Sequence, residues 1–230
     1  MKYRIQFSKT GRLKFIGHLD LLRTFQRVLN RAQIPLAYSQ GFNPHPLLSF
    51  AHPLALGSTG LREYMEMQLE REMAEEEILA RLNANFPEHL HASRCERIPE
   101  GTPAAMAQVC AARYTIELPQ VAGIDWASQM AELFSQDAIF VEKLGKKHGR
   151  KQMVSLDIKP LIESWAVSQD GKMELLCVCG SEQNLKPDLL VHRLMEEAGH
   201  PELAFTEAIE REELYRKEEG RLLPFLPFTP

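Results

Sequence analysis

The sequence is poor in cysteine, and its four cysteines have none of the spacings that usually bind metals. They stand at positions 95, 110, 177 and 179, and they form neither a CxxC pair nor a CxxxCxxC cluster motif. Cys177 and Cys179 lie two apart in an apolar run, so a strand would place both on one side, where burial suits them better than chelation. We therefore expect thiols, the usual state of cysteine in the cytosol.

Long apolar runs are also missing. No stretch approaches the roughly 18 to 20 apolar residues that a membrane-spanning helix needs. The N-terminal MKYRIQF is too short and too polar for the core of a signal peptide. With 44% hydrophobic and 25% charged residues, the composition is typical of a folded domain. We therefore expect a cytoplasmic protein without a membrane partner, and 230 residues allow one large domain or two ordinary ones.

Complete catalytic signatures are the third absence. The sequence contains no P-loop, no GxGxxG, no GxSxG and no HExxH pattern. Gly57-Ser-Thr-Gly60 is too short to count as a phosphate-binding loop. The sequence therefore leaves open whether the chain is an enzyme, and it favours a protein without a reaction of its own.

Basic residues are concentrated in two segments, although the net charge is −4. Met1 to Arg31 holds eight lysines and arginines against one acid, Asp20, and Lys143 to Lys151 holds five more and no acid. Two basic segments in an acidic chain suggest a surface that faces a polyanion. The alternative is that these are ordinary solvent-exposed faces, and the sequence weighs the two equally.

The first half has the element order β-α-β-β-α-β. A helix from His18 to Gln33 is predicted to bury Leu19, Leu22, Phe25, Val28, Leu29 and Ala32, and to place Arg23, Arg27 and Arg31 in one row on the opposite face. The other predicted elements are strands at Lys2–Ser8, Leu36–Ser39, Glu63–Glu70 and Leu90–Ile98 and a helix at Met73–Asn85. In the first strand, Lys2, Arg4 and Gln6 are expected on the solvent side.

The second half repeats this order with one extra hairpin. Its predicted elements are strands at Ala112–Leu118, Ala138–Leu144, Lys172–Cys179 and Leu203–Arg211, helices at Asp125–Ser135 and Pro187–Glu197, and extended pieces within Met153–Val167. The fold class is therefore α+β, with two tandem ferredoxin-like βαββαβ units that have antiparallel sheets. The predicted boundaries are 1–98 for the first unit, 99–109 for a linker, 110–212 for the second unit and 213–230 for a C-terminal tail.

Histidines near the first helix are the candidates for chemistry. A cluster of His18, His45 and His52 would suit a metal site or general acid–base catalysis, but no spacing identifies either, and we assign no metal ligand. His18 and Asp20 lie two apart at a helix start and cannot form a simple acid–base pair. The candidate catalytic residues are His18, Asp20 and His45, and structural or partner-binding hydrogen bonds are the alternative role.

The hexapeptide GFNPHP is predicted to be a rigid turn that faces a substrate or partner. Its prolines fix φ and force the residues before them away from helical geometry, while glycine and asparagine tolerate a positive φ. The turn consists of Gly41, Phe42, Asn43, Pro44, His45 and Pro46.

The basic segments fit nucleic acid better than a small substrate. Phe15 lies among basic residues and can stack on a base, and GKKHGRKQ is predicted to be a basic hairpin loop that can clamp a backbone. The candidate phosphate-binding residues are Arg12, Lys14, Arg23, Arg27, Arg31, Lys146, Lys147, Arg150 and Lys151.

Two longer patterns carry a family resemblance. F-x-K-x-G-x-x-x-F-x-x-H-L-D is met by Phe7, Lys9, Gly11, Phe15, His18, Leu19 and Asp20, and S-x-G-F-N-P-H-P-x-x-S-F is met from Ser39 to Phe50. With Gly149-Arg150-Lys151 and Asp157-Ile158-Lys159-Pro160 in the second half, the chain resembles the radical-SAM-linked proteins, an uncharacterised bacterial family with a DUF2344-type domain.

The resemblance implies a partner rather than a reaction. It implies that the chain works beside a radical-SAM enzyme, in RNA or ribosome modification. Because this chain lacks CxxxCxxC, it has no cofactor of its own, and S-adenosylmethionine and the iron–sulfur cluster would belong to the partner. The leading hypothesis is an RNA-recognition or substrate-presenting accessory protein. The alternatives are an RNA-processing or RNA-modifying enzyme that uses histidine acid–base chemistry, and a pure protein-interaction module that docks through the apolar tail Leu222 to Phe228.

Overall fold

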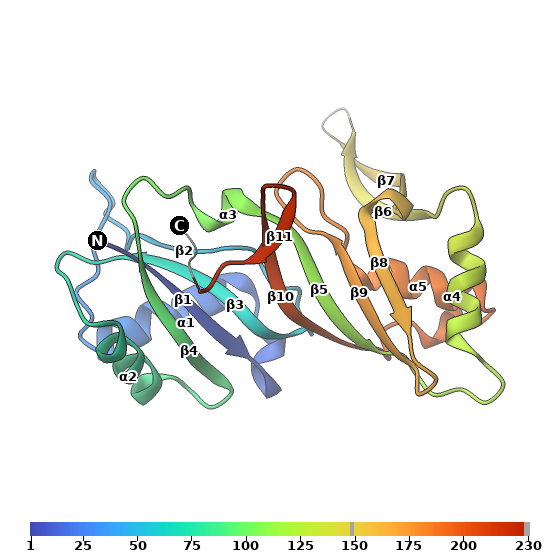
Figure 1. The fold of residues 1–230 in the computed structure, drawn as a ribbon, viewed down its shortest axis with the longest axis horizontal. Helices are drawn as coiled ribbons and strands as arrows, with labels where there is room; N and C mark the ends of the chain where they lie inside the picture. The colour runs from blue at the N-terminus through green and yellow to red at the C-terminus, as the bar shows by residue number, and fades with distance from the viewer. Residues whose placement is uncertain (148–149, 228–230) are drawn as a thin grey trace. The chain divides into compact units, whose positions relative to one another are not determined.

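A computed structural model describes residues 1–147 and 150–227 of the chain (Figure 1). The fold class is α+β, as predicted, with mostly antiparallel strand pairs. The chain divides into two compact units. The first comprises Met1–Ala111 together with the C-terminal segment from Glu210, and the second comprises Ala112–Ile209.

The first unit is built around a sheet in the order β4-β1-β3. Its elements are β1 (Lys2–Lys9), the 3₁₀ helix η1 (Gly11–Phe15), α1 (His18–Arg31), β2 (Leu48–Phe50), β3 (Thr59–Gln68), α2 (Glu75–Asn85), β4 (Leu90–Ile98), α3 (Ala105–Gln108), β10 (Ala208–Glu218) and β11 (Arg221–Pro224). On the edge of β3 away from β1, β2 pairs antiparallel with the C-terminal half and β10 pairs parallel with the N-terminal end. The predicted strand at Leu36–Ser39 is reduced to two isolated bridges, Leu36 with Leu69 and Tyr38 with Pro46.

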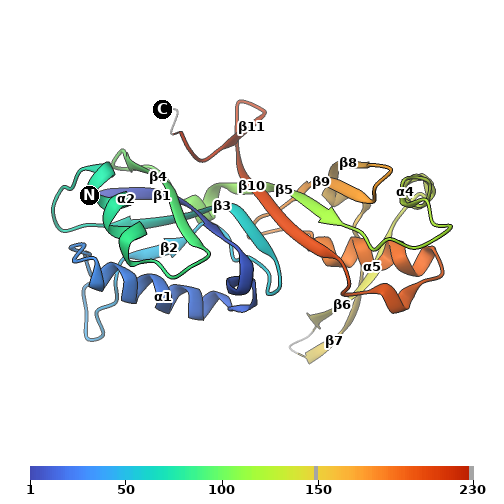
Figure 2. The ribbon, with the colours of Figure 1, turned by 90° about the horizontal axis from the view of Figure 1, so that it is seen from below.

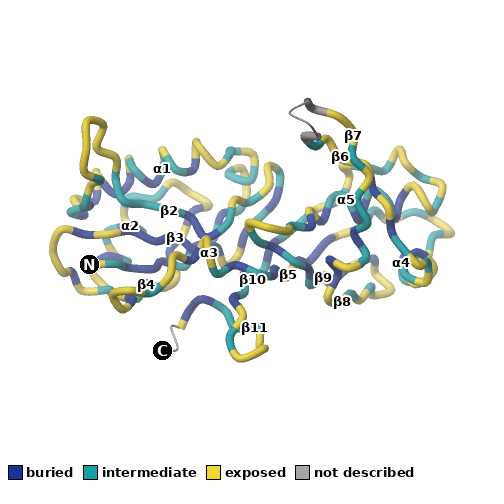
Figure 3. The backbone as a smooth tube through the Cα atoms, turned by 90° about the horizontal axis from the view of Figure 1, so that it is seen from above, coloured by how far each residue is buried: buried dark blue, intermediate teal, exposed yellow. Residues whose placement is uncertain are grey.

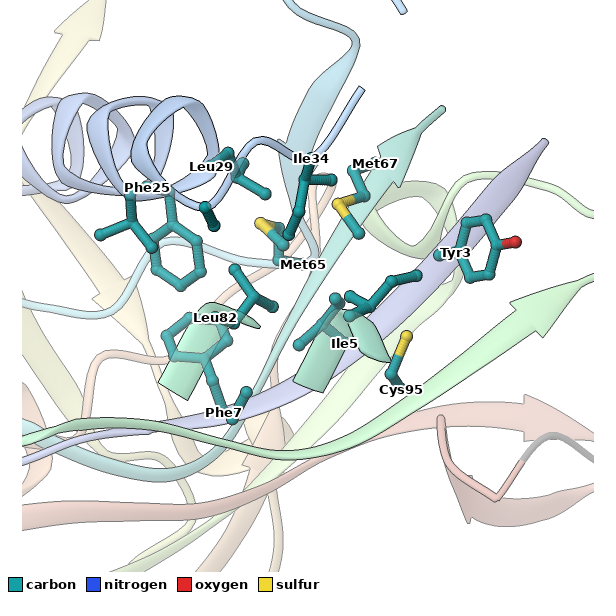
Figure 4. Close-up of a cluster of buried hydrophobic side chains, with 14 of the residues drawn as sticks. Tyr3, Ile5, Phe7, Phe25, Leu29, Ile34, Met65, Met67, Leu82 and Cys95 are labelled. Carbon is teal, nitrogen blue, oxygen red and sulfur yellow. The ribbon is translucent and has the colours of Figure 1, made fainter. Parts of the chain in front are cut away.

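The main core lies between the sheet and helices α1 and α2. Tyr3, Ile5 and Phe7 alternate along β1 and are buried against residues from both helices (Figure 4). The Phe7 ring packs edge-on against Phe25 of α1, with 4.9 Å between centroids. Burying each large apolar side chain here contributes about 1.5 to 3 kcal/mol. Figure 3 shows that β1 and β3 are largely buried.

Helix α1 corrects one predicted core position. Leu21, Phe25, Val28, Leu29 and Ala32 are buried at helical spacing, but Leu19 is 63% exposed. A residue two positions before Leu21 lies about 200° away around a helix, so Leu19 faces solvent when Leu21 faces the sheet. Leu22 is only partly buried.

The other face of the sheet is covered by the C-terminal segment, where solvent was expected. Arg4 is fully buried, and its guanidinium lies 4.9 Å from the Phe225 ring. The Phe225 ring also packs on Tyr64 of β3, with 5.3 Å between centroids. In Figure 2, α1 lies on one side of the strands and β11 on the other. The alternation in β1 identified two faces correctly, but the polar face is largely covered: Arg4 is buried, and Lys2 and Gln6 are half-buried.

This segment also changes the expected boundaries. Residues from 213 were expected to form a tail, but β10 continues to Glu218 and pairs with β11. Phe225 and Leu226 are buried, so the tail from Leu222 does not offer these side chains for docking, and Phe228 lies outside the described residues. The expected linker 99–109 contains α3, and the amide of Ala105 donates a hydrogen bond to Glu66 Oε2 at 3.2 Å.

The second unit has the strand order β5-β9-β8, with a separate antiparallel hairpin β6-β7. Its elements are β5 (Val109–Glu117), α4 (Trp126–Ser135), β6 (Phe140–Lys147), β7 (Arg150–Asp157), η2 (Lys159–Leu161), β8 (Ile162–Val167), β9 (Lys172–Val178), α5 (Pro187–Glu197) and η3 (Pro201–Leu203). Asp125 caps α4 by accepting a hydrogen bond from the Ala127 amide. The extra hairpin predicted here is β6-β7, and its His148 and Gly149 lie outside the described residues. The last strand was expected at Leu203–Arg211, but β10 begins only at Ala208.

Candidate functional site

Three buried charged side chains meet where β1 ends and β3 begins. Lys9 is 1% exposed, Glu63 4% and Arg211 1%. Arg211 Nε donates to Glu63 Oε1 at 2.8 Å, and the second guanidinium arm bonds Glu63 Oε2, so the pair is bidentate. The parallel pairing of β10 with β3 places Arg211 opposite Gly60. A Cβ at Gly60 would lie 2.6 Å from Glu63 Oε1, so only glycine leaves room for this carboxylate.

Lys9 is the last residue of β1, and its ammonium lies near enough to Glu63 and Arg211 for both charges to act on its pKa. Its Nζ donates to the Ile16 carbonyl at 3.2 Å. Burial lowers the pKa of Lys9, the Glu63 charge opposes that shift, and the Arg211 charge adds to it. A lysine held this way can supply a proton donor or, when deprotonated, a base.

His52 is fixed against the same arginine. Its Nδ1 lies 3.3 Å from Arg211 Nη1 and 3.1 Å from the Pro53 carbonyl oxygen, and its own carbonyl accepts from Arg211 Nη2 at 3.0 Å. Burial, followed by the Arg211 charge, lowers the pKa of His52. The ring is therefore held neutral near pH 7, the form in which imidazole acts as a base.

His18 and His52 line one small cavity together with Lys9 and Glu63. The cavity has a volume of about 10 Å³, close to the space that one water or one ligand oxygen occupies. The exposed His18 ring packs against Phe50, with 5.5 Å between centroids. Two of the three clustered histidines predicted from the sequence are thus brought together.

The other candidate catalytic residues lie elsewhere. Asp20 forms an exposed ion pair with Arg23 at 3.0 Å on the surface of α1 and does not line the cavity. His45 lines a different groove, along β2 and the C-terminal half of β3. Within the described ranges, no group of three or more histidine, cysteine, aspartate or glutamate side chains is placed to hold a metal ion.

The basic loop predicted to bind phosphate joins the cavity residues Lys9 and His18. Gly11 opens η1 with a φ of +51°, and a Cβ there would lie 2.6 Å from the His89 ring, so the loop requires glycine. The Lys14 carbonyl accepts a hydrogen bond from the Gly57 amide at 2.8 Å, which ties η1 to the loop that follows the cavity residue Leu54. Phe15 is 66% exposed, and Lys14 Nζ lies 5.2 Å from its ring.

The arginine row on α1 is exposed, as predicted, but the three arginines differ in their polar partners. Arg23 pairs with Asp20, and Arg31 donates to the Asn85 carbonyl at 2.8 Å. Arg27 forms no ion pair with the described residues, so its charge is not compensated locally. Of the predicted phosphate-binding residues in the second unit, Lys146 and Lys147 end β6, and Arg150 and Lys151 begin β7.

Sequence reasoning missed Glu63 and Arg211. Glu63 occupies one position of an alternating strand and looks like any exposed acid there, and Arg211 lies 148 residues further along the chain. Lys9 was noted only as one of eight N-terminal basic residues and as part of a pattern. A basic residue at the end of an apolar strand was the available signal.

None of the described helices is both long enough and apolar enough to span a bilayer. No curated protein matches the chain. The family of uncharacterized proteins conserved in bacteria known as DUF2344 matches residues 2–187, which is most of the sequence, and the chain belongs to this family.

Proposed function

We propose that this protein recognises RNA on the surface formed by η1, the outer face of α1 and the mouth of the His18–His52 cavity. Supporting this, one short stretch combines the exposed Arg12, the half-buried Lys14, an exposed aromatic ring and a cavity for one oxygen atom. Cations bind phosphates without regard to sequence, and an aromatic ring stacks on unpaired bases. The observation that carries the proposal is the exposed Phe15 beside Lys14, in the loop between the cavity residues Lys9 and His18.

The proposed architecture is two tandem ferredoxin-like units. In the first unit β2 lies beside β3, β3 beside β1 and β1 beside β4, all antiparallel. In the second, β8 lies beside β9 and β9 beside β5, and the helices α4 and α5 hold the corresponding places in the chain. This repetition supports the proposal, with β6-β7 as an insertion in the second unit.

The proposed partner is a radical-SAM enzyme, and the setting is RNA or ribosome modification in the cytoplasm. The support is the resemblance carried by the two N-terminal patterns. In this proposal S-adenosylmethionine and the iron–sulfur cluster are the partner's, and this chain presents the RNA.

RNA binding and its salt dependence test the proposal. Fluorescence anisotropy with a labelled single-stranded RNA should give binding that weakens steeply with salt. Arg27→Ala and Lys14→Ala should each reduce the slope of log affinity against log salt by about 0.7, the contribution of one single-strand phosphate contact. Phe15→Ala should weaken binding by about 1 to 3 kcal/mol, the stacking energy of one base, without changing the slope.

Arg71→Ala is the matched control. Arg71 is exposed and lies beyond the C-terminal end of β3, whereas the β3 residue that lines the cavity is Glu63, so about 17 Å of strand separates the cavity from that end. This variant removes the same charge and should leave affinity and slope unchanged. Absence of RNA binding at low salt, or equal effects of Arg71→Ala and Arg27→Ala, would refute the proposed surface.

A second candidate function is RNA cleavage or modification by this chain itself, favoured by the shared cavity of His18 and His52. In cleavage, His52 would take the proton of a ribose 2′-hydroxyl as that oxygen attacks the adjacent phosphorus. His18 would protonate the departing 5′-oxygen, which leaves a 2′,3′-cyclic phosphate and a 5′-hydroxyl. Lys9, which lines the cavity, would stabilise the additional negative charge on the phosphate.

Two substitutions distinguish this candidate from simple recognition. His18→Gln and His52→Gln should each lower the rate of cyclic-phosphate formation at least about a hundredfold, the usual contribution of a general acid or base, while RNA binding persists. His91→Gln, an exposed histidine on β4, is the control. If both variants cleave RNA like the wild type, acid–base catalysis at this cavity is excluded.

A further inference from the structure

A second concave site lies in the first unit, along β2 and the C-terminal half of β3. It is an open groove of about 250 Å³, just below the size range of pockets for drug-sized ligands. Its floor and walls come from the GFNPHP turn, β2, β3, the first residue of β1 and the start of α3. The lining includes Lys2, His45, Ser49, Glu66, Met67 and Gln68.

Hydrogen bonds within the turn fix the orientation of the His45 ring. The backbone amide of His45 donates to Ser39 Oγ at 3.1 Å, and the same Oγ lies 2.8 Å from His45 Nδ1. Because this hydroxyl already accepts one hydrogen bond, we assign its proton to a bond with Nδ1. The neutral ring then carries its own proton on Nε2, so His45 presents a hydrogen-bond donor from an exposed position.

The charge at the bottom of the groove is positive. Glu66 is buried, and its Oε1 accepts from the buried Arg4 at 2.7 Å while its Oε2 accepts from Lys2 Nζ at 2.8 Å and from the Ala105 amide at 3.2 Å. Two cations therefore surround one carboxylate whose oxygens are both engaged. Lys2 is 22% exposed, and its ammonium keeps two further N–H donors beyond the one given to Glu66.

The remaining lining suits a ligand with an apolar ring attached to an anion. Ser49 lies opposite Glu66 in the β2–β3 register and adds a hydroxyl, and the exposed Gln68 adds an amide. Pro46, Leu47 and Leu48 form an apolar wall beside these donors. The free N–H and O–H donors of the groove are more than the two oxygens of a carboxylate can accept. A phosphate monoester, with three terminal oxygens, matches them better.

We infer that this groove binds a phosphate monoester of nucleotide size. The phosphate contacts His45 Nε2 and Lys2 Nζ, and the base or ring lies against Pro46 and Leu48. This site is separate from the His18–His52 cavity, with which it shares no lining residue, and the inference does not depend on the proposed RNA surface. Two sources offer this chemistry: a free nucleotide, and the phosphorylated end of an RNA strand.

Isothermal titration calorimetry of the whole chain with adenosine 5′-monophosphate and with adenosine tests the inference. The monophosphate should bind and adenosine should not. His45→Ala and Lys2→Gln should each weaken binding of the monophosphate about tenfold or more, as expected for the loss of one hydrogen bond to a charged group. Lys2→Gln keeps an N–H donor for Glu66, so this variant should fold. It therefore still tests the inference if His45→Ala does not fold.

His91→Ala and Arg12→Ala are the controls, because both residues are exposed and neither lines the groove. Arg12→Ala also separates the two proposals, since it should weaken RNA binding and leave nucleotide binding unchanged. Competition by RNA oligonucleotides with a 5′-phosphate or a 5′-hydroxyl identifies the source of the phosphate. The inference is overturned if adenosine binds as tightly as the monophosphate, if the monophosphate does not bind at millimolar concentration, or if both variants fold and bind it like the wild type.

Discussion

Glu213 should make the stability of the first unit depend on pH. Its carboxylate is 5% exposed on β10, where Oε1 accepts from the Tyr64 hydroxyl at 2.6 Å and from the Leu214 amide at 3.0 Å. Burial raises the pKa of Glu213 from 4.5 to about 7, although these hydrogen bonds and the Arg62 charge oppose the shift. Glu213→Gln keeps an acceptor for both donors and removes the charge.

The magnitude follows from the two pKa values. A carboxyl group whose pKa is higher in the folded state binds its proton more tightly there, so stability is highest at low pH and falls as pH rises from about 4.5 to about 7. A difference of about 2.5 pKa units corresponds to about 3 kcal/mol. The variant should therefore exceed the wild type by about 1 kcal/mol at pH 5 and by about 3 kcal/mol at pH 8.

Urea unfolding at these two pH values, followed by circular dichroism, measures the difference. The lost pairing with Arg62, which is 58% exposed and 3.7 Å away, subtracts at most about 1 kcal/mol. Glu100→Gln, at an exposed glutamate in a turn, controls for the removal of one carboxylate. The reasoning is refuted if Glu213→Gln is less stable than the wild type at pH 8, or if the difference between the two is the same at both pH values.

Three further substitutions test the buried clusters by urea unfolding. Arg211→Met should lower the free energy of unfolding by about 3 to 5 kcal/mol, because it leaves the Glu63 carboxylate buried without its bidentate partner. Adding Glu63→Met should restore much of this loss. If Arg211→Met alone is as stable as the wild type, the reasoning is contradicted. Phe225→Ala should lower the free energy of unfolding by about 3 to 5 kcal/mol, since the ring is fully buried against Tyr64 and Arg4. A loss no larger than that of Leu223→Ala, at a half-buried position, would mean that the C-terminal segment is detached in solution. Lys9→Met should be more stable than the wild type at pH 7, because burial lowers the pKa of Lys9 and the charged form is disfavoured in the folded state. This advantage should shrink as pH rises toward the ordinary lysine value of 10.5, and an advantage that grows with pH would show that the assigned direction is wrong.

Local patterns in the sequence were sufficient to predict most of the elements. Helix α5 and strand β4 have the predicted bounds, Pro187–Glu197 and Leu90–Ile98. A proline in the first turn and a glycine after the last turn set the limits of α5. In β4, alternation is limited to the first four residues, Leu90–Ser93. The arginine row of α1 was also predicted, because residues four apart on a helix always share a face. Such signals act within a few residues, so a single sequence contains them.

The tertiary structure alone decided which of these residues work together. Glu63 and Arg211 meet because β10 returns to pair in parallel with β3, and pairing between segments 148 residues apart leaves no periodic signal. The same return covers the face of β1 that alternation marked as polar, so Arg4 became a buried ion-pair partner rather than a solvated cation.

The histidines illustrate the same limit. The sequence identified His18, His45 and His52 as candidates but could not show which of them share a site. The packing of the loop after β2 places His52 with His18 in one cavity and leaves His45 in another groove. The sequence by itself thus determined the elements and the family resemblance, because these depend on neighbours along the chain. The composition of both candidate sites was decided by long-range strand pairing and by the burial of charge.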